Sequence, residues 1–166
     1  LERFRTSVGA TTALERTTVE AFLHSVLHQL EGSGLWFPRI EAVATPGGPI
    51  LRYRHRSAPE MTSQVILATT TDDPRKTPLV KGPDLDALLR LRISVASLGA
   101  SEAIMVDNLG AVVEGAYSTI VAWLGETEAL AIVPRSTPRL PSITEHVVEE
   151  IAQQQGIPVY ETTLRP

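Results

Sequence analysis

A charged segment that is broken twice by proline divides this sequence into two halves, each of which mixes helix and strand patterns. The segment runs from Asp72 to Pro78 and reads Asp-Asp-Pro-Arg-Lys-Thr-Pro. Because proline cannot continue a helix or donate a hydrogen bond to a sheet, neither element is expected to run through this segment. We therefore predict an N-terminal subdomain at 1–71, a linker at 72–80 and a C-terminal subdomain at 81–166.

The first half combines one amphipathic helix with strands. Apolar residues recur at helical spacing from Val19 to Leu30, and the run Thr17-Thr18-Val19-Glu20 is typical of a capping box. Strand patterns follow at 38–45, 50–56 and 64–71, the first two joined by a turn of proline and glycine. These patterns predict a small α+β unit.

The second half repeats this mixture in a different order. Asp84 is placed to cap a helix that carries Leu85, Leu88 and Leu89 on an apolar face. Strands are predicted at 102–107, 111–114, 119–124 and 129–133, followed by a helix at 142–155 and a last strand at 159–163. Helices and strands on both sides of the linker predict a mixed α/β or α+β fold.

Composition excludes several classes of protein. The formal charge of -4 over 166 residues gives no reason to expect nucleic acid or an anionic membrane as a partner. No apolar run approaches the roughly 20 residues that span a bilayer. The absence of cysteine excludes disulfides and is compatible with a cytoplasmic location. His24, His28 and His146 lie on predicted helices without the spacing of a metal site, so no metal is expected.

Two residues carry the chemistry of the second half. Lys81, one of only two lysines, opens it, and Glu114 lies within the apolar run that begins at Val112. A reactive amine and a carboxylate in apolar surroundings are what a pyridoxal phosphate enzyme needs. The amine holds the cofactor as a Schiff base, and the carboxylate keeps the pyridine nitrogen protonated. The alternatives are a solvated linker lysine and a carboxylate that faces water from an edge strand.

A family resemblance favours the catalytic interpretation. It rests on Lys81, on Leu98 to Asp107, on Gly110 and Val113-Glu114-Gly115, and on Leu140 to Thr144. These residues resemble the class IV aminotransferases, the fold-type IV group that includes branched-chain and D-amino-acid transaminases and aminodeoxychorismate lyase. The segment Leu1 to Ser7 is similar to the one in which the family's histidine, two residues and an arginine lead into a helix. The resemblance implies a fold-type IV enzyme of two subdomains, both truncated at the chain ends.

The resemblance also assigns roles to residues. It implies that Lys81 is the catalytic lysine that attaches to pyridoxal phosphate, and that Glu114 faces the pyridine nitrogen. Ile143 and Thr144 would hold the phosphate at the start of a helix, where free amides and the helix dipole form an anion site. Arg3 is the implied second phosphate contact. A plain helix cap by Ser142 or Thr144 is the alternative at the phosphate position.

Several positions depart from the family pattern. Glu145 stands where many members have an arginine, and its carboxylate would repel a phosphate unless it points outward to solvent. Thr119 replaces a frequent asparagine, and Pro46 interrupts a turn that usually contains arginine. These differences bear on substrate choice and on activity.

Arg52, Arg54 and Arg56 lie at alternate positions of a predicted strand and therefore share one face. Paired arginine donors are suited to recognise a substrate carboxylate. A solvated face of a hairpin is the alternative, and the sequence leaves both open.

Three functions follow from these residues and the resemblance. The first is a pyridoxal-phosphate-dependent aminotransferase that moves an amino group between a small amino acid and a 2-oxo acid. The second is an aminodeoxychorismate lyase that releases pyruvate in folate synthesis. The third is a catalytically degenerate member that acts as a binding subunit. The resemblance implies a small-molecule substrate and a homodimer.

Overall fold

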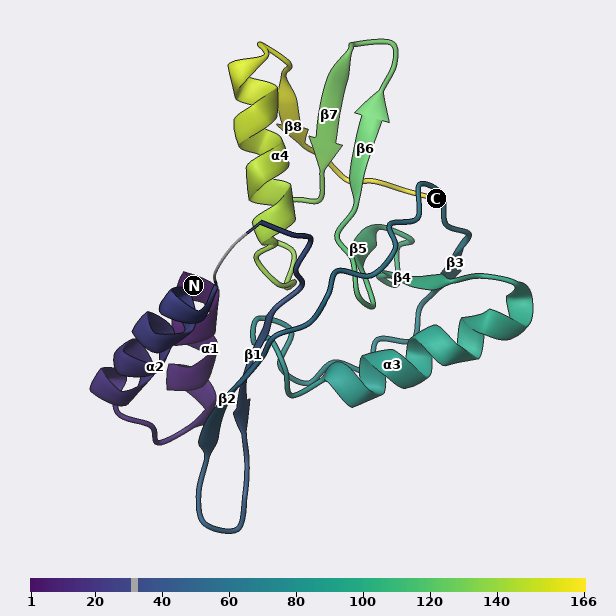
Figure 1. Ribbon diagram of the computed structural model, residues 1–166. Coiled ribbons are helices and arrows are strands. Elements are labelled where there is room, and N and C mark those ends of the chain that lie inside the picture. The colour runs from purple at the N-terminus through teal and green to yellow at the C-terminus, as the bar shows by residue number, and fades with distance from the viewer. Residues whose placement is uncertain (31–32) are drawn as a thin grey trace. The chain divides into compact units, whose positions relative to one another are not determined.

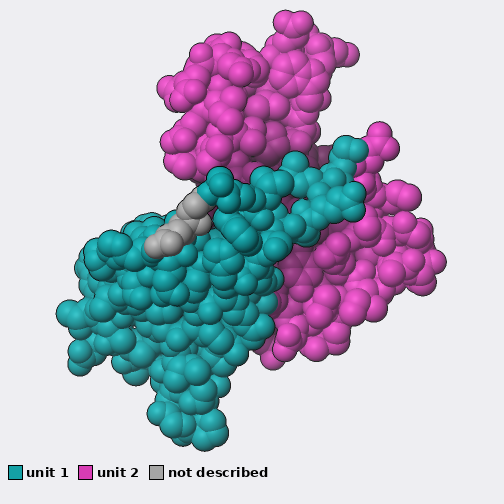
Figure 2. Space-filling view, in the orientation of Figure 1, with its two compact units in different colours: residues 1–63 teal, residues 64–166 magenta. Residues whose placement is uncertain are grey.

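The computed structural model describes residues 1–30 and 33–166, which form two compact units (Figure 1). The first comprises residues 1–63 and the second residues 64–166, shown in teal and magenta in Figure 2. Helices and strands occur in both, and the mixed α/β fold predicted from the sequence is confirmed.

The boundary between the units precedes the predicted linker. Strand β3 (Leu67–Thr70) pairs in parallel with β4 (Glu102–Val106), so that the strand predicted at 64–71 belongs to the second unit. The proline-containing segment 72–80 is a loop within that unit. Pairing between strands that lie far apart in the chain decides the boundary here, and composition does not report such pairing.

The first unit contains two helices and a β-hairpin. Helices α1 (Glu2–Thr11) and α2 (Arg16–Gln29) bury Val8, Val19 and Leu23 together. Strands β1 (Arg39–Val43) and β2 (Ile50–Arg54) pair in antiparallel register, and Ile40, Ala42 and Leu51 pack against the same cluster. The predicted capping box is wrong. Helix α2 begins at Arg16, its N-cap is Glu15, and no side chain caps it within the described residues.

One sheet of the second unit has the order β3-β4-β5. Strand β5 (Val112–Gly115) pairs with β4 in antiparallel register, and α3 (Leu85–Ser94) continues into the 3-10 helix η1 (Val95–Leu98). Ala103 and Met105 pack with α3 and η1, whereas Ile104 and Val106 belong to a second cluster with Val133. Alternate residues of a strand point to opposite faces. Both faces of β4 are covered, and this explains why its residues after Glu102 are all apolar.

The second sheet of this unit has the order β6-β7-β8. Strands β6 (Val121–Leu124) and β7 (Ala129–Ile132) form a hairpin, and β8 (Val159–Glu161) pairs with β7 in parallel. Helix α4 (Ile143–Gln154) connects β7 to β8 and lies beside this sheet (Figure 1). The loop 133–142 connects β7 to α4, and its Leu140 lines the pocket described below.

None of the helices in the described part of the chain has the length and apolar composition that a bilayer crossing requires.

Candidate active site

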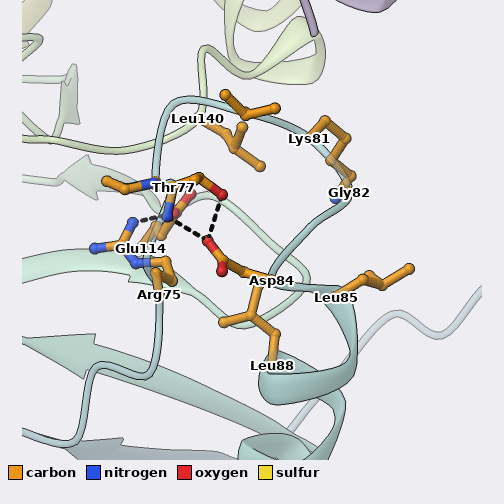
Figure 3. Close-up of a pocket in the computed structure, with 11 residues that line it drawn as sticks. Arg75, Thr77, Lys81, Gly82, Asp84, Leu85, Leu88, Glu114 and Leu140 are labelled. Carbon is orange, nitrogen blue, oxygen red and sulfur yellow. Dashed lines mark hydrogen bonds and ion pairs between the residues drawn. The ribbon is translucent and has the colours of Figure 1, made fainter. Parts of the chain in front are cut away.

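A pocket in the second unit gathers both residues on which the sequence analysis depends. Lys81 and Glu114 line it together, one from the loop before α3 and the other from β5 (Figure 3). The empty space of about 280 Å³ in this pocket includes space that is open to solvent. The other lining residues come from the loop 75–84, from α3 and from the loop before α4, and they include Arg75, Thr77, Asp84, Leu85, Leu88 and Leu140.

Lys81 lies on an exposed part of the loop that connects β3 to α3. The residue after it, Gly82, has a φ of 133°, a backbone conformation that side chains with a Cβ rarely adopt. Gly82 therefore permits the sharp change of direction that follows Lys81. The Gly82 carbonyl accepts a hydrogen bond from the Leu85 amide at 3.0 Å, which connects the loop to the first turn of α3.

Asp84 holds the same loop in a way that the sequence did not indicate. Asp84 is the N-cap residue of α3, as predicted, but its side chain makes no cap bond at the described start of this helix. Instead, the Asp84 carboxylate accepts bonds from the Thr77 amide at 2.8 Å and the Thr77 hydroxyl at 3.0 Å. Burial would raise the pKa of Asp84, but hydrogen bonds led by that of the Thr77 amide lower it overall. The ionised carboxylate thus closes a loop that contains Lys81.

Glu114 is buried and paired with an arginine. Its carboxylate accepts a hydrogen bond from Arg75 Nη1, and the two side chains are 8% and 5% exposed. Arg75 is fixed in turn by two bonds to the Asp73 carboxylate, at 2.8 and 2.7 Å, and by one to the Pro138 carbonyl at 3.1 Å. The edge-strand alternative, a carboxylate that faces water, is therefore contradicted for the described chain.

The electrostatics of Glu114 combine two opposing effects. Burial raises the pKa of this carboxyl, and the charge of Arg75 opposes that rise. Because the folded-state pKa is raised, ionisation of Glu114 reduces the stability of the fold as the pH rises through that value. Arg75 limits this loss by stabilising the ionised form.

Arg75→Met should lower the free energy of unfolding at pH 7 by about 3–5 kcal/mol, because it leaves a buried carboxylate unpaired. The loss should shrink as the pH falls through the raised folded-state pKa of Glu114, because the carboxyl then takes up a proton and no unpaired charge stays buried. Urea unfolding of full-length protein at several pH values measures both effects. Asp73→Asn is the control, because it removes the charge of the other carboxylate that Arg75 contacts but leaves the Glu114 pair. A loss that is equal at pH 4 and pH 7 would contradict this account.

Ser118 lies so close to Gly115 that it leaves little room for a side chain at that position. A Cβ at this position would lie 2.1 Å from the Ser118 hydroxyl and 3.1 Å from the Ser118 carbonyl oxygen. The Gly115 amide donates to that carbonyl at 2.8 Å, so the chain turns tightly directly after Glu114. This turn fixes the end of β5 and with it the position of the Glu114 side chain.

The predicted phosphate residues lie at the first turn of α4. Ile143 and Thr144 are its first two residues, and both are exposed. An α-helix provides no hydrogen-bond acceptor for the backbone amides of its first residues, so α4 itself provides none for these two. Ser142 is the N-cap, and its hydroxyl accepts a hydrogen bond from the Glu145 amide at 3.2 Å. The capping alternative is thus correct for Ser142, and it leaves the two preceding amides for an anion.

Glu145 does not point outward to solvent. It is 4% exposed, and its carboxylate accepts bonds from Arg139 Nη2 at 2.9 Å and from the Thr119 hydroxyl at 3.0 Å. The condition that Glu145 points outward to solvent is therefore not met. A buried arginine compensates its charge.

Arg52 and Arg54 share one face of β2, as their spacing predicts, and both contact Glu41 on β1. Their Nε atoms lie 2.9 and 3.1 Å from the Glu41 carboxylate, and Arg39 Nη2 lies 2.5 Å from it. Burial would raise the pKa of Glu41, but the Arg52 hydrogen bond and the three guanidinium charges lower it overall. In the described structure these arginines form ion pairs with Glu41 within the hairpin. Recognition of a substrate carboxylate stays a prediction.

Arg3 lies on α1, partly buried, in the first unit. Its predicted phosphate contact would join this unit to α4 of the second unit, and it stays a prediction.

Sequence reasoning missed Arg75 and Arg139, the two buried arginines nearest to the candidate site residues. Arg75 stands in the charged segment that predicted a solvated linker, and its partner Glu114 lies 39 residues further along. Arg139 precedes Leu140 in a loop and contacts Glu145 in the first turn of α4. In both cases the burial that gives the arginine its role arises from tertiary packing.

Comparison with solved structures identifies the fold. A branched-chain aminotransferase from the thermophilic archaea Thermoproteus uzoniensis, solved with norvaline, aligns with 99% of this chain at a TM-score of 0.78 and 20% identity. A candidate 4-amino-4-deoxychorismate lyase from Legionella pneumophila aligns with 99% at a TM-score of 0.74 and 15% identity. An aminotransferase from Brucella abortus bound to PLP aligns with 96% at a TM-score of 0.68 and 19% identity.

The chain spans less than two thirds of each of these three proteins, covering 61%, 66% and 62% of their lengths. None of the curated proteins matches the sequence at a significant level. The profile of the family described as amino-transferase class IV matches residues 1–166, the whole chain. The chain therefore belongs to the class IV aminotransferase family.

Proposed function

We propose that the full-length protein is a pyridoxal-phosphate-dependent aminotransferase that moves an amino group between a small amino acid and a 2-oxo acid. The observation that carries this proposal is the pocket shared by Lys81 and Glu114, in a chain that belongs to the class IV aminotransferase family. Pyridoxal phosphate, when bound, supplies an aldehyde that reacts with amines and a ring that withdraws electrons from the substrate α-carbon.

The residues of the pocket fit this cofactor. Lys81 offers an amine on a loop closed by the Asp84–Thr77 bonds, and Glu114 offers a buried carboxylate held by Arg75. The first turn of α4, whose residues do not line this pocket, offers amides for a phosphate. An amine, a carboxylate and an anion site are the three kinds of group that the aldehyde, the ring nitrogen and the phosphate require.

Each residue then has a distinct role. Lys81 Nζ holds the cofactor covalently in the resting enzyme, and it moves a proton to and from the substrate α-carbon. Glu114 holds a proton on the ring nitrogen, and Arg75 favours the charged state of Glu114 in which it can do so. Thr144 and the amide of Ile143 bind the phosphate, with Arg3 as a second cationic contact.

We propose as well that the protein acts as a homodimer. Val65, Ile66 and Leu67, which lead into β3, are 55%, 65% and 49% exposed. An apolar segment of this kind is typical of a surface that a second subunit covers.

Substrate assays on full-length protein test the reaction. A panel of amino donors with 2-oxo acids should give transfer of the amino group, measured as the new amino acid. Release of pyruvate from aminodeoxychorismate without any such transfer would instead identify the protein as a lyase. Loss of both activities in protein that binds the cofactor would contradict the proposal that it is an enzyme of this type.

Thr144→Ala should weaken binding of pyridoxal phosphate by about 1.5–3 kcal/mol, the cost of one lost hydrogen bond to a charged group. Arg3→Ala should weaken binding at least as much if Arg3 is the second contact. Titration of the cofactor into the apoprotein, followed by absorbance, measures both. Thr127→Ala, in the exposed turn between β6 and β7, is the control and should bind like wild type. A Thr144→Ala variant with wild-type affinity would place the phosphate elsewhere.

A further inference from the structure

Arg139, Glu145 and Thr119 form a closed hydrogen-bonded network at the N-terminal end of α4. Arg139 Nη2 donates to the Glu145 carboxylate at 2.9 Å and to the Val133 carbonyl at 2.7 Å. Arg139 Nη1 donates to the Thr119 hydroxyl at 3.4 Å, and that hydroxyl donates to the second Glu145 oxygen at 3.0 Å. The network connects the segment before β6, the end of β7 and the first turn of α4.

Both charged members of this network are removed from water. Arg139 is 6% exposed and Glu145 is 4% exposed. Among the described side chains, Arg139 Nε is buried with no hydrogen-bond partner, so this guanidinium is held by its two terminal nitrogens. A buried ion pair can persist only if both charges remain, because loss of one leaves the other uncompensated in a medium of low polarity.

Glu145 lies in the helix turn that is proposed to bind a phosphate, so its charge affects that binding. Glu145 is the third residue of α4, in the turn whose first amides are those of Ile143 and Thr144. A carboxylate in the first turn of a helix is attracted by the same amides and dipole that attract an anionic ligand. If its charge were not neutralised, Glu145 would compete with a phosphate for the amides and the positive end of the helix dipole, and it would also repel the phosphate.

We propose that Arg139 is a positioning residue that neutralises Glu145 and holds it away from the exposed amides, so that the first turn of α4 can accept a phosphate group. This inference rests on the proposed function, which places the cofactor phosphate at Ile143 and Thr144. The arginine acts through Glu145 rather than by touching the ligand, since the Arg139 side chain is enclosed.

The ratio of affinities for pyridoxal phosphate and for pyridoxal isolates the phosphate site, because the two ligands differ only in that group. In full-length apoprotein, Arg139→Met should lower this ratio about tenfold, since it exposes the phosphate to an uncompensated carboxylate. The double variant Arg139→Met/Glu145→Gln has no charge at either position and should restore the ratio to within about twofold of wild type. A double variant as defective as Arg139→Met alone would overturn the proposal.

Two further variants keep the test decisive if Arg139→Met does not fold, which urea unfolding reports. Glu145→Gln retains the Arg139 charge and should keep or raise the ratio, whereas a fall would overturn the proposal. Arg135→Met removes an exposed arginine from the same loop, 57% exposed and paired with Glu149 and Glu161, and should leave the ratio unchanged. An equal fall in that variant would show a general effect of charge and would also overturn it.

The same titration separates this inference from the proposed function. Wild-type protein that binds neither ligand would contradict the proposed function itself. Wild-type protein that binds both, with an unchanged ratio in Arg139→Met, would contradict only the role of Arg139.

Discussion

Lys81→Ala should abolish covalent attachment of pyridoxal phosphate and lower the rate of amino transfer by at least about 10³-fold. The physical reason is that one amine performs two tasks, as the nucleophile that holds the cofactor and as the base that moves the α-proton. Steady-state rates with the best amino donor, together with the absorbance of the bound cofactor, measure both consequences. Binding through the phosphate should persist, because the first turn of α4 is unchanged.

The matched control for Lys81→Ala is Lys76→Ala. Lys76 is the other lysine of the chain, lies five positions earlier in the same loop and is exposed. Its replacement should leave both the rate and the attachment of the cofactor close to wild type. If Lys76→Ala loses the cofactor while Lys81→Ala stays active, then Lys76 and not Lys81 is the lysine that attaches to the cofactor.

Glu114→Gln should retain the cofactor but lose turnover on the order of 10²-fold. The amide fills the same buried space, yet it cannot stabilise a proton on the ring nitrogen, and the charge that develops at the substrate α-carbon is then less well delocalised. Measurement of kcat beside the cofactor dissociation constant separates these two outcomes. A loss in kcat without a comparable loss in affinity is the expected result.

Glu102→Gln is a suitable control for Glu114→Gln. Glu102 is also buried, lies on the neighbouring strand β4, and accepts a hydrogen bond from the Ala103 amide at 2.9 Å. The Glu102→Gln variant shows the general effect of replacing a buried carboxylate of this sheet with an amide. Equal rates in the two variants would mean that Glu114 is not the partner of the ring nitrogen.

The sequence predicted the secondary structure of the second unit well, because its elements are marked by local patterns. Strand β4 is apolar after Glu102, β5 follows it after the Asp107–Gly110 turn, and α4 has a serine cap and an amphipathic face. What local patterns do not contain is pairing at a distance. Strand β3 was predicted in the first subdomain, and its parallel pairing with β4 places it in the second unit.

The candidate site divides in the same way. Lys81 and Glu114 were predicted from residue type and resemblance, and the structure places both at one pocket. The residues that set their surroundings were not predicted, because the contacts of their side chains depend on how the loop 72–84 folds and packs. Asp84 looked like a helix cap and instead holds Thr77, while Arg75 looked like a solvated linker residue and instead pairs with Glu114.

Glu145 illustrates how packing changes the meaning of a substitution. In the sequence, a carboxylate in the phosphate turn was one of the features that supported the alternative of a degenerate family member. In the structure, Arg139 and Thr119 hold that carboxylate in a buried network, so the departure from the family pattern is accompanied by a compensating cation. The presence of Glu145 is therefore no argument against phosphate binding.

Reductive trapping tests the central claim most directly. Full-length protein saturated with pyridoxal phosphate is treated with borohydride, which makes the link between cofactor and lysine permanent, and the labelled peptide is identified by mass spectrometry. The account predicts a single label on Lys81. A label on Lys76, or no label in saturated protein, would contradict it.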